Sequence, residues 1–104
     1  MLFLVYALDY PDALPKRLAA RTDHVALGDK LKAEGHLLLA IPLKNQHDEM
    51  CGSVLLMSYD SEEALRTQWL QHEPYMLNTV WETIKIHPCG IGPSFVDLFS
   101  NMIS

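Results

Sequence analysis

Three short runs of this chain are apolar at nearly every position, without the alternation that a half-exposed strand shows. They cover residues 2–8, 37–41 and 54–57. A sheet with helices on one face and water on the other alternates polar and apolar residues, whereas strands buried on both faces are apolar throughout. The runs are too short for helices and rich in branched and aromatic residues. We therefore expect strands of a sheet whose two faces both need cover.

Helical patterns separate these strands. Residues 14–34 predict a first helix in two pieces, a short turn over 15–20 and a main helix that Thr22 or Asp23 caps. Gly35 follows directly and is typical of a helix C-terminus. The main helix would then begin close to His24.

A second helix is predicted to begin in the acidic segment 60–63, which carries both a cap and a negatively charged first turn. Its apolar stripe is expected to include Leu65, Trp69 and His72. Pro74 disfavours helical geometry at Glu73 and should end the helix.

The expected strands are residues 2–8, residues 37–41 ending at Pro42, residues 51–58 and residues 83–87, with a polar loop over 44–50. The order is β-α-β-β-α-β. Its simplest closed arrangement is the ferredoxin-like α+β sandwich, a four-stranded antiparallel sheet with both helices on one face. In that topology the start of the first helix and the end of the second lie at the same edge of the sheet, beside the 43–50 loop.

The chain of 104 residues predicts one domain over 1–90 and a C-terminal helical extension over 91–104. In the extension Ser94 can cap a helix with an apolar stripe of Phe95, Leu98, Phe99, Met102 and Ile103. About three turns are too few to cover four strands. We therefore expect a homodimer in which a second copy covers the remaining sheet face.

Charge and cysteine content exclude several classes of function. The net charge is −5 with only 8 Lys and Arg, so nucleic acid is not an expected partner. The apolar start has no basic leader and meets Asp9, so we expect neither a signal peptide nor a membrane span, and a cytoplasmic protein. Cys51 and Cys89 form no CxxC motif, and no histidine pair has zinc-ligand spacing. Neither metal nor cofactor is expected.

Two polar clusters, residues 21–24 and 72–75, should meet at the shared edge. Ala20, Leu27 and Leu31 lie on the helix face of His24, which therefore points toward the sheet. An imidazole beside the Glu73 carboxylate can transfer protons. Alternatively, His24 is a buried histidine satisfied by one hydrogen bond, and Glu73 is an exposed carboxylate at a helix end.

Three further residues are candidates for substrate binding. Arg21 could hold an anionic metabolite, or could pair with Asp23 or Glu73. Ser53 and Tyr75 could donate hydrogen bonds to a substrate oxygen, although serine at a strand start and tyrosine in a core are both common.

Several of these segments together resemble the YciI-like, or YCII-related, family over about residues 1–90. The matching segments are residues 2–7, Lys16-Arg17-Leu18 with Arg21-x-x-His24, the segment from Gly35 to Pro42, Gly52-Ser53 and Glu73-Pro74-Tyr75. The family belongs to the dimeric α+β barrel group, so the resemblance implies two ferredoxin-like units packed sheet to sheet.

The resemblance also implies a histidine and an aspartate as a catalytic pair. The histidine corresponds to His24, whereas Glu73 stands where the family has aspartate, and Ile41 stands where it usually has glycine. Relatives include a dehydrochlorinase and resemble muconolactone isomerases. The pattern thus suggests a cofactor-independent lyase or isomerase that uses His24 and Glu73 on a small organic acid. A non-enzymatic dimeric module, for metabolite binding or assembly, is the alternative.

Overall fold

A computed structural model describes residues 1–99 of the chain. Their secondary-structure elements are, in order, β1 (Leu2–Asp9), α1 (Leu14–Ala33), β2 (Leu37–Lys44), β3 (Met50–Ser58), α2 (Glu62–Gln68), the 3-10 helix η1 (Leu70–His72), α3 (Pro74–Leu77), β4 (Trp81–Cys89) and the 3-10 helix η2 (Pro93–Phe99). The predicted β-α-β-β-α-β order is confirmed, with α3 as an additional turn before β4.

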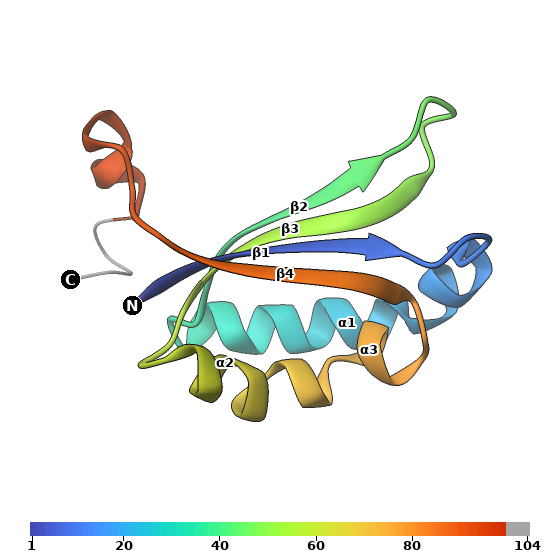
Figure 1. Ribbon diagram of the computed structural model, residues 1–104, viewed down its shortest axis with the longest axis horizontal. Coiled ribbons are helices and arrows are strands. Elements are labelled where there is room, and N and C mark those ends of the chain that lie inside the picture. Colours follow the sequence, from blue (N-terminus) through green and yellow to red (C-terminus); the bar gives the residue numbers. More distant parts are fainter. Residues whose placement is uncertain (100–104) are drawn as a thin grey trace.

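The four strands form one antiparallel sheet in the order β2-β3-β1-β4. Helices α1, α2 and α3 all lie on one face of this sheet (Figure 1). This is the ferredoxin-like α+β sandwich that the sequence predicts. Within the sheet, most of the buried residues belong to the two central strands, β1 and β3, because each has a strand on both sides.

The core lies between the helices and the inner face of the sheet. Phe3, Val5 and Ala7 alternate along β1 and are almost completely buried. They pack in one cluster with Leu65 and Trp69 from the segment around α2. Burial of large apolar side chains contributes about 1.5–3 kcal/mol each relative to exposure, so this cluster is the main source of stability.

The first helix is continuous, so the prediction of two pieces is wrong. It begins after Ala13, and Pro15 occupies its first turn, where no backbone N–H donor is required. Thr22 and Asp23 are exposed and cap nothing, because the buried face continues across them. His24 consequently lies in the middle of α1 rather than in a first turn. The predicted helix end is confirmed, since Gly35 has φ +85°.

Strands β2 and β4 extend clearly beyond their predicted bounds. β2 does not stop at Pro42 but continues to Lys44, with Pro42 opposite Ser53. The missing N–H of a proline is tolerated here because β2 is an edge strand. β4 is longer than expected at both ends, because residues from Trp81 to Cys89 pair with β1.

The end of the second helical segment places its charged residues differently from the prediction. His72 is exposed and does not join the buried stripe of Leu65 and Trp69. Glu73 takes its place and is only 2% exposed. As predicted, the residue before Pro74 leaves helical geometry, with ψ 125° at Glu73. This extended residue turns its carboxylate inward.

The described part of the C-terminal extension is a 3-10 helix rather than the predicted α-helix. Met102 and Ile103 of the predicted stripe lie outside the described residues. Phe95 and Leu98 are 59% and 71% exposed, and no residue of η2 is buried. With its side chains largely exposed, burial contributes little to the stability of this segment. It projects beyond the end of β4, on the side of the sheet away from the helices (Figure 1).

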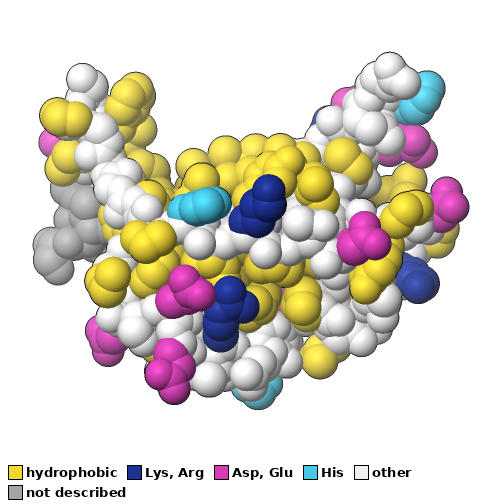
Figure 2. Space-filling view, viewed as in Figure 1, with side chains coloured by type: hydrophobic (Ala, Val, Ile, Leu, Met, Phe, Trp, Pro, Cys, Tyr) yellow, Lys and Arg dark blue, Asp and Glu magenta, His cyan; other side chains and the backbone are white. Residues whose placement is uncertain are grey.

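The sheet face opposite the helices is apolar and uncovered by the described residues. Cross-strand neighbours Leu39, Leu56 and Leu4 form one row, and Ile41, Val54 and Tyr6 form the next. Leu4, Leu39 and Ile41 are between 37% and 45% exposed. Figure 2 shows hydrophobic side chains gathered along this face, between η2 and the β2–β3 hairpin. Within residues 1–99, no helix has the length and apolar character needed to cross a membrane.

Candidate active site

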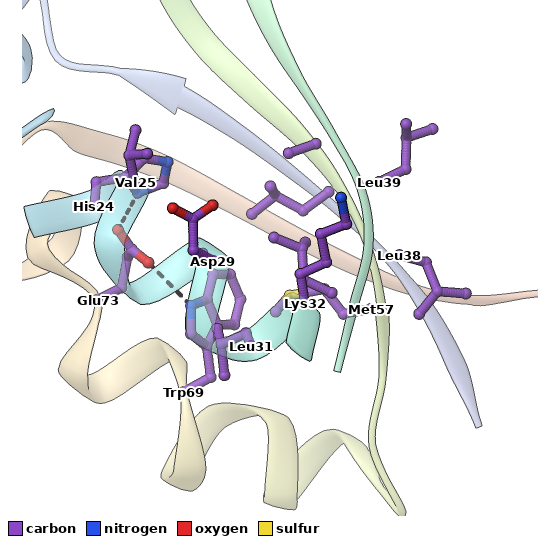
Figure 3. A pocket seen from close by; sticks show the side chains of 14 residues that line it. His24, Val25, Asp29, Leu31, Lys32, Leu38, Leu39, Met57, Trp69 and Glu73 are labelled. Carbon is purple, nitrogen blue, oxygen red and sulfur yellow. Dashed lines mark hydrogen bonds and ion pairs between the residues drawn. The ribbon is translucent and has the colours of Figure 1, made fainter. Parts of the chain in front are cut away.

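The predicted meeting of His24 and Glu73 is present. His24 projects from the middle of α1, and its Nδ1 contacts Glu73 Oε1 (Figure 3). The side chain of His24 is 19% exposed and that of Glu73 is 2% exposed. An ionised carboxylate only accepts hydrogen bonds, so Nδ1 carries the proton and donates it. With the Nδ1 proton held in this way, Nε2 is the nitrogen that can accept a proton.

Glu73 is held by three donors. Besides His24, Trp69 Nε1 donates to Oε2 at 3.0 Å and the Tyr75 backbone N–H donates to Oε1 at 3.3 Å. A buried carboxylate is costly unless it is paired and hydrogen-bonded. These contacts satisfy both oxygens and fix the carboxylate beside the imidazole.

Aromatic rings fix the plane of the imidazole. His24 stacks on Tyr75 with ring centroids 3.8 Å apart and planes 9° from parallel. The Trp81 ring lies nearly perpendicular to His24, with ring centroids 6.0 Å apart and planes at 83°. A hydrogen bond on one nitrogen and a stacked ring on one face together restrict rotation of the side chain.

Tyr75 also contributes a hydroxyl group. Burial raises the pKa of this hydroxyl, and the nearby positive charges of Arg17 and Arg21 only partly oppose that effect. The hydroxyl is therefore protonated at neutral pH and can donate a hydrogen bond.

A buried arginine that the sequence analysis did not select lies beside the pair. Arg17 is 2% exposed and forms an ion pair with Asp9, with Nε 2.8 Å from Oδ2. Its Nη2 donates to the carbonyl of Gly52 at 2.8 Å and to Ser53 Oγ at 2.9 Å. The guanidinium also lies over the Tyr75 ring, with Cζ 4.6 Å from the centroid. Helical spacing could have identified it, because Arg17, Ala20 and His24 share one face.

These side chains line a small cavity of about 150 Å³ between α1, α3 and the strands β2 and β3. Four predicted residues meet there: Arg21, His24, Ser53 and Tyr75. Glu73 lies behind His24 rather than on this wall. The rest of the lining is mostly apolar and includes Val25, Pro42 and Met50. The cavity thus combines cationic and hydrogen-bonding groups with hydrophobic ones.

A second and larger cavity begins on the other side of His24. It measures about 330 Å³ and runs along α1 past Glu73 and Trp69 toward Leu31 and Met57 (Figure 3). His24 therefore borders both spaces. Among residues 1–99, no three His, Cys, Asp or Glu side chains are grouped so that they could hold a metal ion.

Comparison with known proteins places the chain in a family. The profile of the YCII-related domain matches residues 1–89. The proteins named YciI from Escherichia coli and Shigella flexneri are each 34% identical over 94 residues, covering 85% of this chain and 95% of theirs. The chain belongs to the YCII-related family.

Solved structures share the fold. The 5-chloro-2-hydroxyhydroquinone dehydrochlorinase of Burkholderia phenoliruptrix AC1100, in complex with 2,5-dihydroxybenzoquinone, superposes with a TM-score of 0.79 at 23% identity. The alignment covers 90% of this chain and 98% of that protein. An antibiotic biosynthesis monooxygenase follows with a TM-score of 0.53 at 16% identity, over 89% and 100% of the two chains. These are proteins of the dimeric α+β barrel, ferredoxin-like type.

Proposed function

We propose that this YCII-related protein is a cofactor-independent lyase or isomerase that moves a proton on a small organic acid. The observation that carries the proposal is the buried Glu73, which bonds His24 Nδ1 and leaves Nε2 as the basic nitrogen beside a cavity containing two arginines. A positioned imidazole with a carboxylate behind it is a general base whose tautomer and orientation are fixed.

In the proposed reaction, Nε2 of His24 removes a proton from the carbon next to a carbonyl group. The C–H electron pair forms a C=C bond to the carbonyl carbon, and the C=O π pair moves to the oxygen, which becomes the enolate oxygen. The imidazolium then returns the proton to a different carbon, which is an isomerisation, or the enolate expels a leaving group from the neighbouring carbon, which is an elimination. Glu73 stabilises the imidazolium and touches no substrate atom in this scheme.

The enolate oxygen needs donors on the same side of the cavity. Tyr75 offers a protonated hydroxyl. The Ser53 hydroxyl can also donate a hydrogen bond, since in its contact with Arg17 it acts as the acceptor. Arg21 supplies positive charge at the more exposed end, where a substrate carboxylate would lie. Such donors stabilise charge that develops during the reaction, and removing one typically lowers the rate about 100- to 1000-fold.

Exchange of hydrogen for deuterium tests the proposal without knowledge of the natural substrate. A panel of small keto acids is incubated with the protein in D₂O, and loss of the proton next to the carbonyl is followed by NMR. We expect His24→Ala to slow the catalysed exchange by about 100-fold or more. Glu73→Asp, which restores the family's residue, should retain more exchange than Glu73→Gln.

A second histidine provides a matched control. His36 stacks on Tyr59 at 4.2 Å and uses Nδ1 in a hydrogen bond to the Ser58 carbonyl, so it resembles His24 without a carboxylate partner. His36→Ala should leave exchange unchanged. Equal exchange by wild type and His24→Ala across the panel would contradict the enzymatic role and favour a binding module.

We also propose that the protein acts as a homodimer through the sheet face opposite the helices. Exposed Leu4, Leu39 and Ile41 support this, because together with Leu56 and Val54 of the strand between them they form an apolar patch that is costly in water. The lysine of the open face, Lys85, lies on the edge strand β4, at the margin of the patch. A second copy related by two-fold symmetry would present the same patch in return.

A further inference from the structure

The larger cavity beside His24 has an apolar wall that proton transfer does not require. Its inner surface is formed by Leu31, Leu37, Leu55, Met57 and Trp69, from α1, the strands and the segment after α2. Its volume of about 330 Å³ falls in the range of small-molecule sites. Asp29 and Lys32, which are labelled in Figure 3, also line it; both are exposed, and their charges are opposite.

The two cavities are adjacent and share part of their lining. His24, Val25, Ala40 and Leu55 border both of them. Charge differs between the two ends, because Arg21 adds positive charge to the smaller cavity beside the Arg17–Asp9 pair, whereas the larger one contains the Glu73 carboxylate at its inner end. An anionic group is therefore attracted to the smaller cavity and repelled from the larger one. This fixes the direction in which a molecule spanning both would lie.

Gly28 keeps the larger cavity open. It lies in the interior of α1, where glycine costs roughly 1 kcal/mol relative to alanine. A Cβ atom at this position would meet Leu37 Cδ2 at 3.6 Å, an ordinary contact distance, so alanine fits. Longer side chains from the same position would enter the space between α1 and β2.

We propose that the larger cavity binds the hydrocarbon part of an amphipathic organic acid, whose oxygen atoms lie at Arg17, Arg21 and Tyr75. This inference rests on the proposed function, because it assigns a substrate class to the same histidine. The reacting carbon would lie at His24, between the polar head and the apolar chain. Short acids would then be poor ligands, since they leave the apolar wall in contact with water.

Calorimetric titration with straight-chain carboxylates from acetate to octanoate tests the inference. Each additional CH₂ group should tighten binding by about two- to fourfold until the cavity is filled. Fluorescence of Trp69, which lines the cavity, should respond to hexanoate and octanoate but not to acetate. Affinities that are independent of chain length in the wild-type protein would overturn the proposal.

Two substitutions of Gly28 test whether the larger cavity itself holds the hydrocarbon chain. Gly28→Leu should abolish the chain-length dependence while acetate binding stays as in wild type, and Gly28→Ala should preserve the dependence. An equal loss for acetate and octanoate in Gly28→Leu would contradict the proposal. A changed oligomeric state of Gly28→Leu by light scattering, with chain-length dependence intact, would instead assign the cavity to a second copy and also overturn it.

The outcome is distinguishable from that of the exchange experiment, because binding of carboxylates requires no proton transfer. Chain-length-dependent binding without keto-acid exchange would support the cavity and contradict the enzymatic role. Exchange without chain-length dependence would support the enzymatic role and reject the amphipathic ligand.

Discussion

Replacing Arg17 with methionine should destabilise the protein more than any change to an exposed ion pair. The substitution keeps an unbranched apolar stem but leaves the Asp9 carboxylate, which is 5% exposed, without its partner. It also removes the donor to the Gly52 carbonyl and to Ser53 Oγ. Breaking a buried pair by removal of one member costs about 3–5 kcal/mol, because the remaining charge is uncompensated.

Urea denaturation at one fixed protein concentration measures this loss. For small proteins the free energy of unfolding changes by about 1–3 kcal/mol per molar urea. The midpoint for Arg17→Met should therefore fall by more than about 1 M. A fixed concentration is needed because dimer stability depends on it.

A double-mutant cycle isolates the interaction between the two side chains. Asp9→Asn alone should cost less than Arg17→Met, because Arg17 keeps its bonds to Gly52 and Ser53. The double variant should lose at least about 1.5 kcal/mol less than the sum of the two single losses. The exposed pair of Arg66 and Glu62 is the control, with an expected coupling of about 0.3–0.5 kcal/mol. Equal coupling energies for the two pairs would refute the reasoning.

Three other predictions concern the dimer, the high-pH limit and a helix cap. Light scattering at micromolar concentration should show monomers for Leu4→Asp. The control Leu18→Asp changes an exposed site of α1 and should leave the dimer intact. A monomeric wild-type protein would contradict the proposed dimer. Burial and, to a smaller extent, Glu34 raise the pKa of Tyr59 from 10.0 to about 12. The neutral hydroxyl therefore makes its full contribution to the free energy of unfolding below pH 10. That contribution, on the order of 3 kcal/mol, should be lost as the pH rises through about 12. Tyr59→Phe should remove this part of the pH dependence in denaturation curves, and an unchanged curve would count against it. Ser61→Ala should cost about 1 kcal/mol by the same assay, because Ser61 Oγ accepts from the Ala64 N–H at 3.0 Å; a neutral result would show that the cap is dispensable.

The sequence by itself determined the order of elements and the inward direction of His24. Continuous apolar runs specify strands, and the spacing of Ala20, His24 and Leu31 specifies one helix face. Pro74 marks a helix end because it disfavours helical geometry at Glu73, and Gly35 marks one because glycine readily adopts a positive φ. Both signals are local and can be read without knowledge of the fold. The contact of His24 with Glu73 then follows from the topology together with the family resemblance.

Only the tertiary structure decided features that depend on distant partners. The local capping signals at Thr22 and Asp23 were overridden, because α1 packs along its whole length and a continuous helix buries more surface. Pro42 was tolerated within β2 because that strand is at the edge of the sheet, which no local pattern reveals.

The charge network was likewise set by tertiary contacts. Arg17 can be buried because Asp9, Gly52 and Ser53, which lie on other elements, accept its hydrogen bonds. Glu73 can be buried because Trp69 and His24 donate hydrogen bonds to it. A charged residue is stable in a protein interior only with such partners, and these partners are known only once the chain is folded.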